Sequence, residues 1–234
     1  MENKSITTIL WDVDGTLLDF DYSMRCSLRK CFRTIGQPIT EEMIQCYSQI
    51  NDGYWKRLER GEITKAELLV GRFRDFFAEY GLTGIDEKTF LKEFQEGLGN
   101  NYAFVDDALT LVKSLQGQYR QYVVTNGVAA TQMNKLKLSG LFEVMDGIFI
   151  SETIGCAKPH RAFFDYCMKQ LAEKDPHRIL IVGDSMTSDI LGGIQAGIKT
   201  CWYNPGEKTH TYDYRADYEI AVLQQLYEVL GIYN

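Results

Sequence analysis

Short apolar segments rich in β-branched residues recur along most of the chain, and a turn or a polar pair ends nearly every one. They occupy residues 6–13, 121–125, 147–150, 179–182 and 200–203. Runs of this length are typical of buried β-strands. Segments with helical spacing separate the later runs, at residues 106–115, 129–138, 161–172 and 188–196. Strands that alternate with helices predict an α/β fold, a doubly wound parallel sheet with right-handed crossovers.

The strand signals disappear between about residue 20 and residue 100. Apolar positions recur there at helical spacing in four segments, at residues 22–35, 41–59, 65–80 and 87–98. Thr40 and Thr64 precede two of these segments as candidate N-caps. We therefore predict an all-helical domain, residues 19–101, inserted after the first strand of a catalytic core that comprises residues 1–18 and 102–234.

The composition is that of an ordinary folded protein, with 45% hydrophobic and 24% charged residues among 234. A formal net charge of −7 argues against binding to a nucleic acid polymer, which requires clustered Lys and Arg. No apolar run approaches the roughly 20 residues of a membrane span. The six cysteines form no CxxC pair, which indicates reduced thiols. We expect a cytoplasmic protein without a membrane partner, either a monomer or a homodimer.

Polar clusters follow four of the predicted strands. They are Asp12 with Asp14, the segment 125–127, Lys158, and the segment 184–189. In a doubly wound sheet the carboxyl ends of the strands meet at one edge. Each cluster alone has an ordinary explanation, since Asp-Gly and Asn-Gly form turns and an aspartate can cap a helix. Their shared position after strands instead predicts one active site.

Three carboxylates at one edge suit a hard divalent cation, because Mg²⁺ takes carboxylate, water and phosphate oxygens as ligands. We expect one Mg²⁺ held by Asp12, Asp184 and Asp14, the last through its side chain or its backbone carbonyl. Asp12 is the expected nucleophile, which would form an aspartyl phosphate. Asp14 is the expected general acid and base, which protonates the leaving oxygen and later deprotonates the attacking water.

A phosphoryl group in transfer spreads negative charge over its equatorial oxygens. Lys158, the Thr125 hydroxyl and the backbone amides of Asn126 and Gly127 are therefore the expected phosphate contacts. Lys158 should also reduce the repulsion between the carboxylates and the substrate phosphate. These residues together predict an enzyme that hydrolyses phosphate esters.

Four motifs resemble those of the haloacid dehalogenase (HAD) superfamily. They are DVDGTL from Asp12, VVTNG up to Gly127, Lys158-Pro159, and GDSMTSD up to Asp189. Their order and spacing match the family over nearly the whole chain, and the helical insertion resembles the family's mobile cap. The resemblance implies aspartyl-phosphate chemistry with Mg²⁺. It implies that Asp189 either supports the metal ligands from behind or orients the helix that follows.

The founding dehalogenases of this superfamily lack the second aspartate, so Asp14 points to phosphate esters. The segment NDGYWKRLERGEITKAELLVGRF, residues 51–73, and other long segments resemble the YjjG-type branch of pyrimidine 5′-nucleotidases. A nucleoside 5′-monophosphate is therefore the expected substrate. Two alternatives remain open. One is a sugar-phosphate or phosphoglycolate phosphatase, or a phosphosugar mutase, on the same core. The other is a non-catalytic binding protein that retains the fold.

Residues on the predicted cap helices are candidates for reading the base. Stacking and hydrogen bonds usually hold a nucleobase, which favours Tyr54, Trp55 and Arg72 as substrate contacts. Aromatic residues at helical spacing more often belong to a core. That is the preferred interpretation for Phe73, and for Trp55 the two interpretations are equally good.

Overall fold

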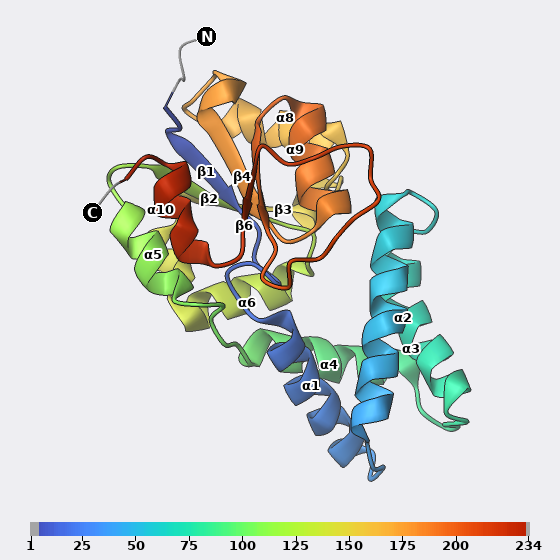
Figure 1. The fold of residues 1–234 in the computed structure, drawn as a ribbon. Helices are drawn as coiled ribbons and strands as arrows, with labels where there is room; N and C mark the ends of the chain where they lie inside the picture. Colours follow the sequence, from blue (N-terminus) through green and yellow to red (C-terminus); the bar gives the residue numbers. More distant parts are fainter. Residues whose placement is uncertain (1–4, 233–234) are drawn as a thin grey trace. The chain divides into compact units, whose positions relative to one another are not determined.

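The chain forms two compact units in the computed structural model, which describes residues 5–232. The sheet unit consists of the chain up to Phe20 and again from Ala103 onward, and the helical unit runs from Asp21 to Tyr102. Figure 1 shows the sheet with its helices in one unit and a group of helices in the other. The chain therefore leaves the sheet unit once and returns to it once.

The two connections to the helical unit begin side by side within the sheet unit. Leu18 forms an antiparallel bridge with Phe104, and the Asp19 backbone N–H donates to the Ala103 carbonyl at 2.9 Å. The Val105 N–H donates to the carbonyl of Leu17, at 3.1 Å. Backbone hydrogen bonds thus tie the outgoing and the returning chain together.

The sheet unit contains a six-stranded sheet in which all neighbouring strands are parallel, in the order β3-β2-β1-β4-β5-β6. The strands are β1 (Thr8–Trp11), β2 (Arg120–Thr125), β3 (Gly147–Ile150), β4 (Ile179–Gly183), β5 (Lys199–Tyr203) and β6 (Tyr218–Ile220). The predicted doubly wound parallel sheet is confirmed. Its direction of winding reverses at β1, and such a switch point is where ligands bind in α/β sheets.

Helices lie between most of these strands, and one follows the last strand. They are α5 (Ala108–Leu115), α6 (Ala129–Ser139), α7 (Ser151–Ile154), α8 (Arg161–Gln170), α9 (Leu191–Ala196) and α10 (Leu226–Val229). Short 3₁₀ turns lie at Leu141–Val144, Pro176–Arg178 and Leu223–Gln225, and a π turn lies at Met186–Ile190. The predicted helix at 188–196 is α-helical only from Leu191 onward, because its first three residues belong to the π turn.

Helices cover both faces of the central strands. On one face, Leu10 of β1 and Ile181 of β4 join a buried cluster with Phe164 of α8. On the other face, the Gln121 side chain donates to the Val112 carbonyl of α5 at 2.9 Å. Strands buried on both faces explain the continuous apolar runs in the sequence.

The sequence pattern does not predict the edge strand β6. Its three residues have a glutamate in the middle, which excludes an apolar run, and three residues are too few to establish an alternation. Hydrogen bonding to β5 nevertheless holds the segment in the sheet. Tertiary pairing decides short strands of this kind, because local preference is weak over three residues.

The helical unit consists of α1 (Phe20–Thr34), α2 (Glu41–Glu59), α3 (Lys65–Glu79) and α4 (Glu87–Asn100), with Phe20 itself in the sheet unit. The predicted N-caps are confirmed, since Thr40 accepts from the Met43 amide and Thr64 forms a capping box with Glu67. Its core is aromatic, with Tyr47 stacked on Phe73. Phe73 is thus a core residue, as its spacing indicates.

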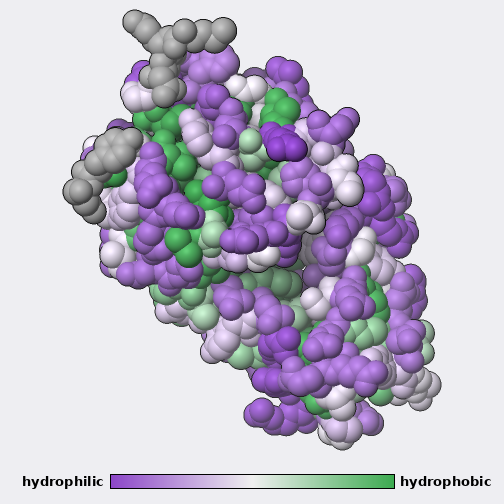
Figure 2. Space-filling view, viewed as in Figure 1, coloured by the Kyte–Doolittle hydropathy of each residue, from purple (hydrophilic) through white to green (hydrophobic). Residues whose placement is uncertain are grey.

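The visible surface is hydrophilic over most of its area, and apolar side chains emerge in narrow strips (Figure 2). Within residues 5–232, no helix combines the length and the apolar character needed to cross a membrane.

Two glycines of the helical unit allow a matched test of its packing. A Cβ atom at Gly71 would lie 2.8 Å from the Tyr54 ring, whereas a Cβ at Gly53 would meet nothing within 4 Å. We expect Gly71→Ala to destabilise the protein by about 1–3 kcal/mol through overpacking. Gly53→Ala should instead stabilise it by about 0.5–1 kcal/mol through helix propensity. Urea denaturation measures both changes, and equal effects would contradict the described packing.

Candidate active site

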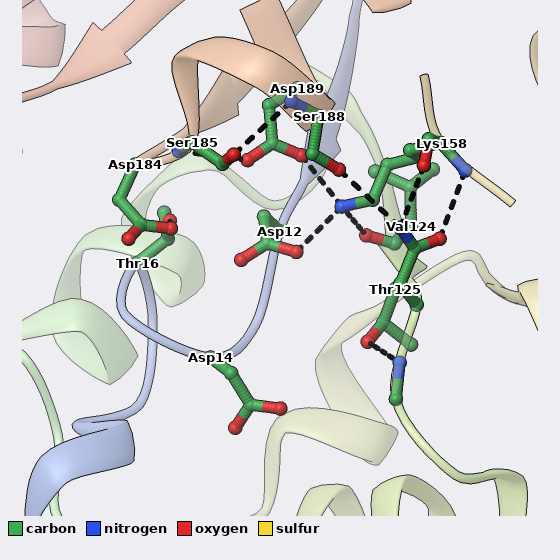
Figure 3. A network of polar contacts seen from close by, with 12 residues as sticks. Asp12, Asp14, Thr16, Val124, Thr125, Lys158, Asp184, Ser185, Ser188 and Asp189 are labelled. Atoms are coloured by element: carbon green, nitrogen blue, oxygen red, sulfur yellow. Dashed lines mark hydrogen bonds and ion pairs between the residues drawn. The ribbon is translucent and has the colours of Figure 1, made fainter. Parts of the chain in front are cut away.

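The carboxyl ends of β2, β1 and β4 are neighbours in the sheet, and a polar side chain stands at each end. Asp12 directly follows β1, Thr125 is the last residue of β2, and Asp184 directly follows β4. Lys158 comes from the loop between α7 and α8, and its side chain points into the same region (Figure 3). The structure therefore brings together the four polar segments that the sequence places after strands.

The Lys158 ammonium lies at the centre of this region and is almost completely buried. Its Nζ donates to Asp12 Oδ1 at 2.6 Å, to Asp189 Oδ1 at 2.6 Å and to the Val124 carbonyl at 2.8 Å. These three acceptors use all three of its hydrogens. One lysine thus joins the end of β1, the strand β2 and the segment after β4.

Burial and charge act in opposite directions on this ion pair. Burial is the largest influence on Asp12 and raises the pKa of its carboxyl well above the usual range, although the nearby Lys158 lowers it. Burial lowers the pKa of Lys158, but Asp12 and Asp189 outweigh it, so the pKa lies above its ordinary value. Lys158 is therefore charged at neutral pH, and a further positive charge beside Asp12 would favour its ionised form.

The segment after β2 lies at the site and also forms hydrogen bonds with the backbone of Lys158. Asn126 Oδ1 accepts from the Lys158 backbone N–H at 2.9 Å, and Asn126 Nδ2 donates to the Lys158 carbonyl at 2.9 Å. The Thr125 hydroxyl accepts from the Gly127 amide at 3.1 Å. The sequence predicts these residues as phosphate contacts, and the structure adds a bracing role for the Asn126 side chain.

The segment after β4 places one aspartate outward and one inward. Asp189 is buried, and its Oδ2 accepts from the Ser185 amide at 3.2 Å while its Oδ1 accepts from Lys158. A Cβ at Gly183 would lie 2.3 Å from the Asp189 carboxyl carbon, so only glycine fits there. Both Asp189 oxygens are occupied, which leaves Asp184 as the outward carboxylate of this segment.

A second glycine admits the Asp184 carboxylate. Gly15 has a φ of +92°, and a Cβ there would lie 2.7 Å from Asp184 Oδ2. The pKa of Asp184 is raised to about 7. Burial by the surrounding protein is the main cause, and the negative charge of Asp189 is the second. Because the side chain is also exposed, water offsets part of this effect.

One carboxylate oxygen each of Asp12, Asp184 and Asp189 lies within 4.8 Å of the others. Because Lys158 and the Ser185 amide already bind the Asp189 oxygens, Asp12 and Asp184 are the side chains of this group that could hold a metal ion. Carboxylate oxygens are the ligands that Mg²⁺ and Ca²⁺ prefer.

Among the described residues, Asp12, Asp14 and Asp189 form ion pairs with the ammonium groups of Lys158 and Lys135. The positive charge of Lys208 also acts on Asp184. Several carboxylate oxygens at one place, with more negative than positive charge around them, suit a divalent cation, so the residues present fit Mg²⁺.

The Asp14 side chain lies apart from this cluster and turns toward α6 (Figure 3). Its Oδ1 accepts from Lys135 Nζ at 2.5 Å, and its Oδ2 accepts from Gln132 Nε2 at 2.6 Å. In this conformation the carboxylate is therefore engaged by α6. The predicted metal contact of Asp14 could then come only from its backbone carbonyl.

Gln132 and Lys135 are polar contacts that the sequence analysis misses. They stand three residues apart, so they share one face of α6. Both are buried together with Leu136, at positions where a helix that covers a sheet usually carries apolar residues. The sequence feature that could have identified them is the presence of two polar residues at positions of the predicted helix that face the sheet.

The predicted base contacts lie in the helical unit. Tyr54 is buried and donates to Asp75 Oδ2 at 2.6 Å. Arg72 is also buried, its Nη1 donates to Asn51 Oδ1 at 2.6 Å, and its Nε and Nη2 have no hydrogen-bond acceptor among the described residues. Trp55 retains partial exposure. Tyr54 and Arg72 are therefore held by partners inside the helical unit, and Trp55 is the candidate that solvent partly reaches.

Comparison with known proteins identifies the class to which this site belongs. Residues 6–197 match the family of haloacid dehalogenase-like hydrolases, and the chain belongs to that family. The resemblance drawn from the four motifs is confirmed. The class accounts for the parallel sheet, the helical insertion and the polar segments at the strand ends.

Individual relatives extend over almost the full chain. It is 38% identical over 231 residues to the HAD-hydrolase YfnB of Bacillus subtilis (strain 168), which covers 99% of this chain and 98% of that protein. A crystal structure of YfnB bound to magnesium has a TM-score of 0.92, and the match covers 98% of this chain and 100% of that one. Its authors describe interdomain movement.

Two further relatives are pyrimidine 5′-nucleotidases. The chain is 31% identical over 222 residues to YjjG of Escherichia coli (strain K12), covering 95% of this chain and 96% of that protein. It is 33% identical over 223 residues to PynA of Streptococcus pneumoniae (strain ATCC BAA-255 / R6), covering 95% and 94%. The similarity to the YjjG-type branch is therefore confirmed.

The raised pKa values of Asp12 and Asp184 give the metal site a pH signature. Without metal, these two carboxyls bind more protons in the folded state than in the unfolded chain between about pH 4 and pH 7, so their contribution to stability falls as pH rises through this window. Mg²⁺ binds the ionised carboxylates and should reverse this loss. We expect Mg²⁺ to raise the melting temperature more at about pH 7.5 than at about pH 5.

Thermal melting with Mg²⁺ or with EDTA at both pH values measures this difference. Asp184→Asn should remove most of the Mg²⁺ effect. Asp165→Asn, which alters an exposed carboxylate on α8, should retain it. An equal Mg²⁺ effect at the two pH values would contradict the assignment of a proton-linked carboxylate site.

Proposed function

We propose that this protein is a Mg²⁺-dependent phosphomonoester hydrolase that forms an aspartyl phosphate on Asp12, and that it acts on pyrimidine nucleoside 5′-monophosphates. The observation that carries the chemistry is the buried contact between Lys158 Nζ and Asp12 Oδ1, at 2.6 Å. It holds one oxygen of the carboxylate and leaves the other on the side of Asp184 (Figure 3). A carboxylate fixed in this way is prepared to attack a phosphoryl group.

The reaction divides into two half-reactions. In the first, an Asp12 oxygen bonds to phosphorus, the bond from phosphorus to the leaving oxygen breaks, and the Asp14 carboxylic acid gives its proton to that oxygen. In the second, a water oxygen bonds to phosphorus, the Asp12–phosphorus bond breaks, and the Asp14 carboxylate takes the proton from the water. The products are an alcohol and inorganic phosphate.

Several residues stabilise the charge on the phosphoryl oxygens. Lys158 supplies an ammonium, and Thr125 with the amides of Asn126 and Gly127 supplies hydrogen-bond donors. Asp12, Asp184 and the Asp14 carbonyl would hold Mg²⁺, which when bound supplies positive charge to the phosphate. Asp189 would position Lys158, because both of its oxygens are already bound.

The proposed substrate rests on the relatives, since two of them that match nearly the whole chain are pyrimidine 5′-nucleotidases. Among Tyr54, Trp55 and Arg72, Trp55 is the one whose side chain is partly exposed in the helical unit. We therefore favour its ring as the base contact. All six cysteines are free thiols, which supports a cytoplasmic location.

Asp12→Asn tests the nucleophile. The substitution removes the attacking carboxylate, so phosphate release from a nucleoside monophosphate should fall by at least about a thousandfold. Asp165→Asn serves as the control, because its exposed carboxylate lies outside the site. Activity of Asp12→Asn within about tenfold of the parent, a barrier change of only about 1.4 kcal/mol, would refute the assignment.

A phosphate-release screen tests the substrate. We expect kcat/KM for uridine, cytidine and thymidine 5′-monophosphates to exceed that for sugar phosphates and phosphoglycolate by about tenfold or more. Trp55→Leu should reduce this preference, because it removes the stacking surface. A preference for sugar phosphates would overturn the nucleotide assignment while leaving the phosphatase chemistry intact. Interconversion of phosphosugars without phosphate release would instead identify a mutase.

A further inference from the structure

The two α6 contacts account for both oxygens of the Asp14 carboxylate. Lys135 Nζ lies 2.5 Å from Oδ1, and Gln132 Nε2 lies 2.6 Å from Oδ2. One donor on each oxygen fixes both the position and the rotation of the carboxylate plane. A single lysine or a single amide would fix only one of these.

This arrangement is unfavourable for stability, which indicates that it serves another purpose. The Lys135 side chain is 1% exposed, and Asp14 is its only ion-pair partner among the described residues. Gln132 is buried, and its Oε1 has no donor within the described chain. Burying an ammonium and half of an amide is costly when apolar side chains could fill the same face. Natural proteins break packing rules of this kind mainly at functional sites.

Of Asp14, Lys135 and Gln132, Asp14 is the residue that solvent reaches, since 24% of its side chain is exposed. Water or substrate can therefore reach the carboxylate while the two donors behind it remain enclosed. Gln132 also touches the segment after β2, because a Cβ at Gly127 would lie 2.3 Å from its Nε2. The donors are thus packed between the helix and the loop expected to contact phosphate.

The displacement of Asp14 from the Asp12 cluster suits the proposed chemistry. In an in-line transfer, the phosphoryl group stands between the nucleophile and the leaving oxygen. The acid that protonates the leaving oxygen must therefore stand away from Asp12. Figure 3 shows the Asp14 carboxylate in such a place, without a contact to Asp12 or Lys158.

We propose that Lys135 and Gln132 are positioning residues that hold Asp14 in the orientation required for proton transfer, an inference that rests on the proposed function. They donate hydrogen bonds and neither gain nor lose a proton. Asp14 gives its proton to the leaving oxygen as the phosphorus–oxygen bond breaks, and regains one from the attacking water. Substrates whose leaving oxygen is strongly basic depend most on this transfer.

The dependence on the leaving group separates positioning from a merely structural role. Nucleoside monophosphates release an alkoxide oxygen that needs a proton, whereas p-nitrophenyl phosphate releases a stabilised phenolate. We expect Lys135→Met to lower kcat/KM for uridine 5′-monophosphate by about thirtyfold or more, but that for p-nitrophenyl phosphate by less than about threefold. kcat/KM is the appropriate constant because it covers the steps up to departure of the leaving group.

Two further variants complete the experiment. Gln132→Leu should show the same selective loss, to a smaller degree, and it keeps the proposal testable if Lys135→Met fails to fold. Lys137→Met is the matched control, since this lysine is exposed on the same helix, and it should leave both constants unchanged. The melting temperatures of folded Lys135→Met and Gln132→Leu should lie within about 3 °C of the parent or above it.

Three results would overturn the inference. The first is an equal fall in kcat/KM of the variants on the two substrates, and the second is an unchanged kcat/KM on both. The third is a fall in kcat/KM that accompanies a large fall in melting temperature. The proposed function fails in a different way, namely if the parent protein releases no phosphate from any monoester or if Asp12→Asn remains active. A parent that hydrolyses both substrates, with Lys135→Met equal to Lys137→Met, would refute the positioning role alone.

Discussion

The site depends on one buried ammonium that lies between two buried carboxylates. Lys158 contacts Asp12, Asp189 and the backbone of β2, so it links three segments that are far apart in sequence. Without it, two carboxylates would remain buried without a counter-charge, and breaking a buried ion pair in this way typically costs about 3–5 kcal/mol. The contact that orients the expected nucleophile therefore also holds together the carboxyl ends of the central strands.

The two lysines of the site have separate surroundings. Lys158 lies inside the cluster and leaves the Asp12 oxygen beside Asp184 available, whereas Lys135 lies behind Asp14 and leaves that carboxylate partly exposed. Four carboxylates that outnumber the ammonium groups paired with them would repel a phosphate ester. A divalent cation removes this repulsion, which is why metal binding and phosphate binding are expected to be coupled.

The sequence predicts the fold and the converging segments well, because both follow from strong local patterns. Buried parallel strands give continuous apolar runs, and polar residues directly after them must lie at one edge of the sheet. The contacts of Gln132 and Lys135 with Asp14 could not be predicted, because a helical pattern does not show which residue a buried polar side chain contacts. Arg72 illustrates the same limit, since only the folded helical unit shows that it is buried against Asn51. Pairwise contacts between distant segments are a property of the packed chain.

The backbone bridge between Leu18 and Phe104 joins the two connections to the helical unit at their base. A segment whose ends leave and re-enter a scaffold at one point can be exchanged without altering the scaffold, as with other tolerated domain insertions. A different inserted domain could therefore replace the helical unit during evolution while the aspartates and lysines of the sheet unit stay in place. Such exchange would allow new substrates to be acquired on an unchanged catalytic apparatus.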